Sequence, residues 1–106
     1  SIYFKVYETW FGSEAQPILL FVTFLDGPKC TWCVEYDTPG GVVQSPSVTT
    51  NNTGKWKTAI FYIPSFRCSG SFPQGMNFRI TLLSGFDLVV HMVRIVKLSE
   101  ELSLNK

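Results

Sequence analysis

Apolar and polar residues alternate with a period of two along much of the chain. In residues 2–7, Ile2, Phe4 and Val6 occupy one parity, which predicts a half-buried strand. Residues 18–25 are apolar at both parities, so we expect a central strand that is covered on both faces. The same criteria predict further strands over residues 32–37, 56–63, 76–82 and 87–98, the last being the longest.

Gly and Pro clusters separate these strands. Residues 42–55 contain one short edge strand, around Val42-Val43 or Ser47–Thr50, followed by a loop. Pro64 is expected to end the strand that starts at Trp56, with a long loop over 65–75. Seven or eight short strands with turns roughly every 8–12 residues are typical of an antiparallel β-sandwich or jelly roll.

The sandwich domain should cover residues 1–98. Residues 99–106 would then form a C-terminal tail or linker, in which Ser99–Leu102 has the pattern of one capped helical turn. Because the chain starts at Ser1 rather than Met, we expect a mature product or a segment of a larger protein.

Composition agrees with a folded β domain and limits its partners. Hydrophobic residues make up 45% and charged residues 16%, which argues against disorder, and the 15% of aromatic residues favours strands. The net charge is +1 and the basic residues are dispersed, so nucleic acid is a poor partner. The longest apolar run, Ile18–Phe24, is too short to span a bilayer.

The three cysteines favour a secreted protein with one disulfide, which would join Cys68 to either Cys30 or Cys33 and leave one free or intermolecular thiol. Cys30 and Cys33 form a CxxC pair. A redox or zinc role is disfavoured, because a strand rather than a helix follows and His91 is the only histidine. The sequon Asn51-Asn52-Thr53 makes Asn51 a candidate glycosylation site.

Three ordered pairs of stretches resemble the galactose-binding-like jelly rolls found beside glycoside hydrolases and in secreted proteins. They are residues 22–27 with 34–37, 53–58 with 61–64, and 77–80 with 91–95. The resemblance implies a non-catalytic sandwich that often binds carbohydrate. Similar modules often carry Asp where this chain has Asn77 and Ser65, so a calcium site that depends on those acids is not expected.

No catalytic constellation stands out, and we expect neither enzyme activity nor a cofactor. His91 is flanked by apolar residues and is expected to be packed or at a rim. Cys68 and His91 could in principle act as a nucleophilic thiol and its general base, but nothing in their spacing favours this role. Acids such as Asp26 and Asp37 at strand ends are more typical of solvated turns than of a glycosidase pair.

A carbohydrate site needs flat aromatic rings beside Asp, Arg or Glu. The candidate ligand-binding residues are Trp10, Asp26, Trp32, Tyr36, Asp37, Arg67 and Arg79, with Phe86 as a further aromatic. Trp56 opens a strand and is expected in the core. Arg79 should be a surface charge or pair with an acid, and Arg94, on an apolar parity, should pair with Glu35 or Asp37.

The sequence therefore predicts a secreted or cell-surface binding module, with carbohydrate as the expected ligand. The alternative is a structural or assembly domain. Apolar residues at both parities of 18–25, 56–63 and 87–98 would suit faces covered by neighbouring domains or by copies of the same chain. An unpaired cysteine would suit covalent assembly.

Overall fold

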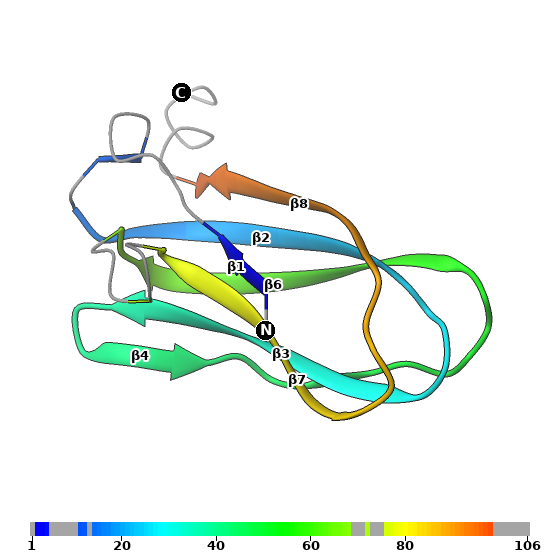
Figure 1. The fold of residues 1–106 in the computed structure, drawn as a ribbon. Helices are drawn as coiled ribbons and strands as arrows, with labels where there is room; N and C mark the ends of the chain where they lie inside the picture. Colours follow the sequence, from blue (N-terminus) through cyan, green and yellow to red (C-terminus); the bar gives the residue numbers. More distant parts are fainter. Residues whose placement is uncertain (1, 5–10, 13, 69–71, 73–75, 99–106) are drawn as a thin grey trace.

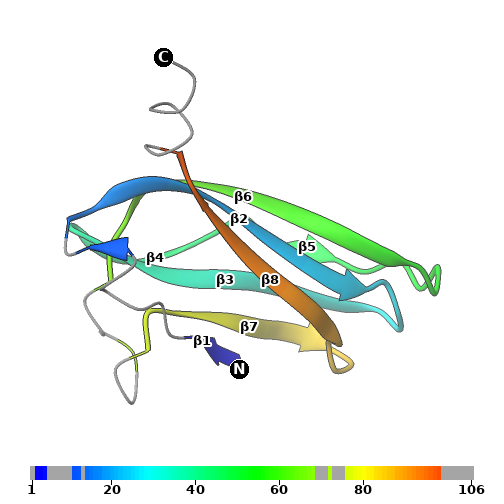
Figure 2. The same ribbon diagram turned by 90° about the horizontal axis from the view of Figure 1, so that it is seen from above.

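The computed structural model describes residues 2–4, 11–12, 14–68, 72 and 76–98. Over this part, two antiparallel sheets pack as a β-sandwich (Figures 1 and 2), which confirms the predicted fold class. The strands are β1 (Ile2–Phe4), β2 (Gln16–Leu25), β3 (Cys30–Thr38), β4 (Gly41–Gln44), β5 (Val48–Thr49), β6 (Trp56–Phe66), β7 (Phe78–Gly85) and β8 (Val90–Lys97).

The two sheets differ in size. The larger has the order β1-β7-β3-β4, with β5 also paired to β3, and the smaller has the order β6-β2-β8. We call them the five-stranded and the three-stranded sheet. Figure 2 shows them as two layers, with β6, β2 and β8 in one and β1, β3 and β7 in the other. In the three-stranded sheet β2 is central, so β6 and β8 are edge strands.

The core lies between the sheets and is built from alternate residues of each strand. Trp32 is at its centre and is 0% exposed. Its ring lies edge-on to Phe24 and Phe61, at centroid distances of 5.2 and 5.8 Å. Edge-on aromatic pairs add about 0.5–1.5 kcal/mol to the area that they bury. The remaining large core residues include Phe11, Ile18, Leu20, Val22, Val34, Ile63, Phe66, Phe78 and Ile80.

Several strand limits differ from those predicted. β6 passes through Pro64 and ends at Phe66. Pro64 is tolerated because β6 is an edge strand and because its pairing with β2 shifts register between Gln16 and Ile18. β8 begins at Val90 rather than Asp87, so β2 and β6 are longer than β8.

Two regions complete the comparison with the predicted elements. The segment expected to hold one short strand forms both β4 and β5. The predicted strand over 2–7 is present as β1, but residues 5–7 lie outside the described residues, as does the predicted tail over 99–106.

Candidate functional site

The register of the three-stranded sheet creates an apolar surface on its outer side. β2 pairs Leu25 with Trp56, Phe21 with Ile60 and Leu19 with Tyr62, and all of these side chains point away from the core. We call this surface the outer face, and its members are Leu19, Phe21, Thr23, Leu25, Trp56, Thr58, Ile60, Tyr62, Met92, Arg94 and Val96. Strand β2 is therefore central, as predicted, but it is covered on one face only.

Four large side chains on the outer face are more than half exposed. The exposed fractions are 55% for Trp56, 60% for Ile60, 61% for Tyr62 and 53% for Met92. The core position that we predicted for Trp56 is wrong. Residues 56–63 are apolar at both parities, so the sequence did not show which parity points inward.

The polar groups of the outer face are few and are engaged with their neighbours. The hydroxyls of Thr23 and Thr58 are 3.1 Å apart and share a hydrogen bond. The Arg94 guanidinium lies 5.0 Å from the centre of the Phe21 ring, a cation–π geometry. The predicted ion pair of Arg94 with Glu35 or Asp37 is therefore wrong, because both acids belong to the other sheet.

Of the two positions predicted for His91, packed or at a rim, the structure agrees with the rim. His91 is exposed, and its ring centre lies 5.4 Å from that of Trp56. The two rings form the aromatic end of the outer face. The outer face as defined carries one cation, Arg94, and no acid.

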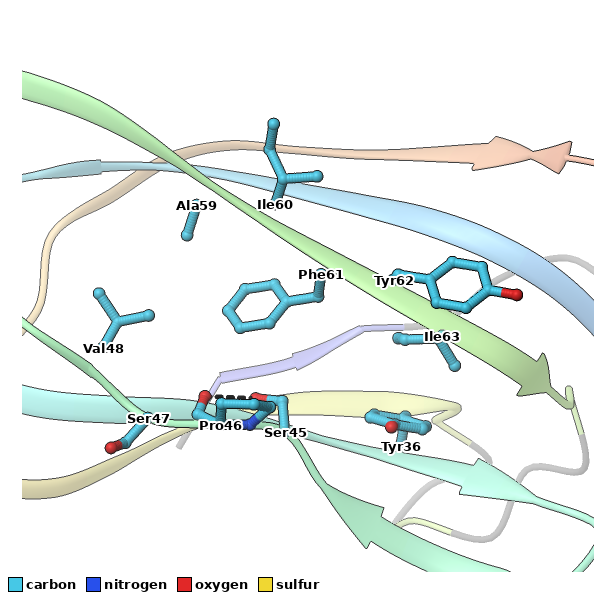
Figure 3. A pocket seen from close by; sticks show the side chains of 10 residues that line it. All are labelled: Tyr36, Ser45, Pro46, Ser47, Val48, Ala59, Ile60, Phe61, Tyr62 and Ile63. Carbon is cyan, nitrogen blue, oxygen red and sulfur yellow. Dashed lines mark hydrogen bonds between the residues drawn. The ribbon is translucent and has the colours of Figure 1, made fainter.

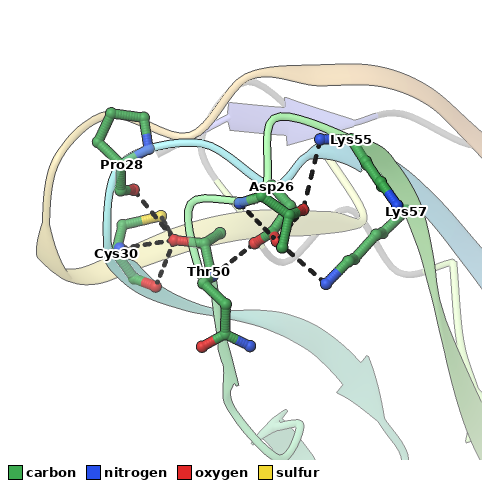
Figure 4. Close-up of polar contacts among 8 residues, drawn as sticks. Asp26, Pro28, Cys30, Thr50, Lys55 and Lys57 are labelled. Carbon is green, nitrogen blue, oxygen red and sulfur yellow. Dashed lines mark hydrogen bonds and ion pairs between the residues drawn. The ribbon is translucent and has the colours of Figure 1, made fainter.

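Asp26 is almost fully buried and organises the loop before β6 (Figure 4). Its carboxylate accepts hydrogen bonds from the Asn51 amide at 2.6 Å and the Thr53 hydroxyl at 2.6 Å, and lies 3.0 Å from Lys57 Nζ. These contacts, led by the Thr53 hydroxyl and the Asn51 amide, hold the pKa of Asp26 well below the ordinary aspartate range. Asp26 therefore fixes the loop rather than facing a ligand.

Asn51 itself is exposed, as a glycosylation site requires. The sequon still contacts Asp26, because the backbone N–H of Asn51 and the Thr53 hydroxyl both donate to its carboxylate. Glycosylation at Asn51 stays a prediction.

The other charged candidates form ion pairs on the five-stranded sheet. Arg79 donates to both carboxylate oxygens of Glu35, at 3.0 and 3.2 Å, and the Thr81 hydroxyl donates at 2.7 Å. The Arg79 and Thr81 hydrogen bonds lower the pKa of Glu35. Arg67 Nε lies 3.1 Å from the buried Asp37. These charged side chains therefore pair with one another within the chain. For Arg79 we predicted either a surface charge or a pair with an acid, and the structure shows the pair.

The aromatic candidates do not gather into one site. Trp32 is fully buried, so its selection as a ligand-binding residue is wrong. Tyr36 is buried beside a groove, Phe86 is exposed in the loop before β8, and Trp10 lies outside the described residues. The register instead brings together a different set of side chains around Trp56. Sequence reasoning had placed Trp56 in the core.

A groove of about 410 Å³ runs beside the free edge of β6 (Figure 3). Residues 59–63 of β6 line it on one side, with Ala59, Phe61 and Ile63 facing inward, and Tyr36 with the segment from Ser45 to Val48 lines it on the other. Burial raises the pKa of the Tyr36 hydroxyl. No charged side chain lines this groove.

The predicted disulfide is absent, because no disulfide joins any two of the three cysteines. Cys30 packs in the core between the sheets, whereas Cys33 is paired with Thr81, is also fully buried, and does not belong to that core cluster. The bond from the Arg67 amide to the Asp37 carbonyl places Cys68 near the other end of β3. Cys30 is at the opposite end of β3, seven residues before Asp37 and about 23 Å away along the strand, which is too far from Cys68 for a disulfide.

The described residues contain no group of three or more His, Cys, Asp or Glu side chains arranged to hold a metal ion. Within the same part of the chain, no helix has the length and apolar character needed to cross a bilayer. No protein-family model, curated protein or solved structure matches this chain.

Proposed function

We propose that this chain is a non-catalytic assembly domain whose outer face docks the apolar surface of another protein, either a second copy or a neighbouring domain. The observation that carries the proposal is the exposure of Trp56, Ile60, Tyr62 and Met92 on one sheet face. A contiguous apolar patch of this kind often marks an interaction site. This function is the assembly alternative that the sequence allowed.

The composition of the outer face is that of a protein interface. Interface cores are enriched in aromatic residues, Met and Arg, and depleted in Lys, Glu and Asp. The outer face has Trp56, Tyr62, Met92 and Arg94 and no acid. Trp, Tyr and Arg are also the residue types that most often dominate binding energy.

The size of the outer face indicates how strong the contact can be. Eight residues along β8 and three strands give a projected area of about 26 × 14 Å, on the order of 400 Å². Stable complexes bury about 800 Å² on each partner, and interdomain contacts begin near 300 Å² on each side. We therefore expect weak self-association of the isolated chain and tight packing only where a neighbouring domain is tethered beside it.

Sedimentation velocity from about 10 μM to about 1 mM tests the docking. The sedimentation coefficient should rise with concentration, and the double substitution Ile60→Thr with Tyr62→Ser should abolish the rise. Val43→Thr is the matched control, because Val43 is an exposed apolar residue on β4, away from the outer face. A chain that stays monomeric over the whole range would overturn docking between copies.

Carbohydrate binding is the second candidate function. It would make this chain a member of the galactose-binding-like sandwiches. The exposed Trp56 ring beside His91 favours it, because the Thr23 and Thr58 hydroxyls lie on the same face. Titration with plant, algal and microbial polysaccharides should then shift tryptophan fluorescence, and Trp56→Ala should abolish binding. An unchanged titration with Trp56→Ala would exclude this surface as the sugar site.

A further inference from the structure

Strand β6 has one unpaired edge. It pairs with β2 on one side and is the last strand of the sheet on the other. Backbone hydrogen bonds bracket the strand, from the Asp26 amide to the Lys55 carbonyl and from the Arg67 amide to the Asp37 carbonyl. Between them, no described segment pairs with the outer edge of β6. An edge strand of this kind presents a row of N–H and C=O groups to any extended chain that approaches it.

The groove lies where the core-facing side of a further strand would fall. Figure 3 shows Ala59 and Phe61 pointing from β6 towards Val48 and the Ser45–Ser47 segment, with the groove opening past the edge of β6. About four residues of an eight-residue strand face inward, so the 410 Å³ gives each about 100 Å³. That space suits apolar side chains of medium size.

The Ser45 hydroxyl in the wall of the groove is already hydrogen-bonded, because it accepts from the Val34 amide at 2.9 Å and donates to the Pro46 carbonyl at 3.0 Å. The edge of β6 can give an occupant backbone hydrogen bonds, and the groove can give it apolar contacts. An extended peptide with alternating apolar residues can use both.

From these observations we infer that β6 and its groove bind an extended peptide segment of another protein as a fourth strand of the three-stranded sheet. The segment pairs with residues 56–63, because Pro64 has no N–H to donate. Its inward side chains fill the groove beside Phe61. This site shares Ile60 and Tyr62 of β6 with the outer face, but it does not depend on the proposed assembly function.

Charge at one end of β6 further defines the peptide. Lys55 is exposed and has no ion-pair partner among the described residues, whereas Lys57 and Arg67 are held by the buried Asp26 and Asp37. An acidic residue at the end of the peptide that lies beside Lys55 would complement this charge. The expected ligand is an extended apolar segment with an acidic end.

Fluorescence anisotropy with a synthetic ten-residue peptide tests the inference. The peptide alternates Val and Thr and ends in two Glu residues, and we expect a Kd below about 1 mM. Methylating alternate peptide amides should weaken binding at least about tenfold, because each methyl removes a hydrogen bond to β6. Equal binding of the methylated peptide, or no binding of the parent peptide, would overturn the inference.

Three variants separate this site from the outer face. Ala59→Phe fills the groove and should reduce peptide affinity, and Lys55→Glu should reduce it about threefold. Met92→Thr lies on β8, outside the residues that line the groove, so it should leave peptide binding unchanged while weakening self-association. Peptide binding that is lost with Met92→Thr and kept with Ala59→Phe would place the peptide on the outer face and contradict the groove.

Discussion

Substitution of Trp32 gives the sharpest test of how the core is built. The indole is fully buried between Phe24 and Phe61, and its Nε1–H has no hydrogen-bond partner within the described part of the chain. Trp32→Ala should lower the free energy of unfolding by about 3–5 kcal/mol, as for other large aromatic truncations. Trp32→Phe removes both ring volume and the unpaired donor, so its two effects oppose each other.

The magnitude for Trp32→Phe follows from these two effects. A residual cavity of about 40 Å³ costs about 1 kcal/mol at 24 cal/mol per Å³. Removing a buried unpaired donor recovers about 1–3 kcal/mol. We therefore expect Trp32→Phe to stay within about 1 kcal/mol of the wild type, or to exceed it slightly.

Urea unfolding followed by far-ultraviolet circular dichroism measures this difference without relying on tryptophan fluorescence. Trp56→Phe is the control, because Trp56 is exposed and its replacement should change stability by less than about 0.5 kcal/mol. If Trp32→Phe cost more than about 3 kcal/mol, the indole N–H would have a partner and the description of the core would be incorrect.

Three further predictions concern the five-stranded sheet and the thiols. Glu35→Gln should cost about 1–2 kcal/mol near neutral pH, because it breaks the charged pair with Arg79. Since folding lowers the pKa of Glu35, this stability is present above the unfolded-state pKa and is lost as the pH falls through the folded-state pKa. The urea midpoints of the wild type and the variant should thus converge in acid, and a constant gap would contradict the pairing. Gly85→Ala should cost at least about 2 kcal/mol in the same assay, because Gly85 has φ of 90° and its added Cβ would meet the Lys29 carbonyl; a neutral effect would contradict that contact. Thiol titration of the unfolded, unreduced chain should give all three cysteines, and in the folded chain Cys33 should react slowly because burial raises its pKa; a count of one would restore the disulfide.

The sequence alone determined the fold class. Alternation over residues 76–82 and the two-sided apolar run of residues 18–25 correspond to β7 and to the central β2. Local patterns were sufficient here because the period of two is a property of the strand backbone itself. The apolar neighbours of His91 left a packed and a rim position open, and they did not indicate the ring contact with Trp56.

The tertiary structure alone decided which faces are covered and which charges meet. Trp56 and Phe61 lie on one apolar strand, and only the packing of the second sheet buries Phe61 and leaves Trp56 exposed. Glu35 and Arg79 are 44 residues apart in sequence, and they pair because β3 and β7 are neighbours. Strand pairing depends on residues that are far apart in the sequence. The alternation along one strand therefore shows which residues share a side, but it does not show which side another sheet will cover.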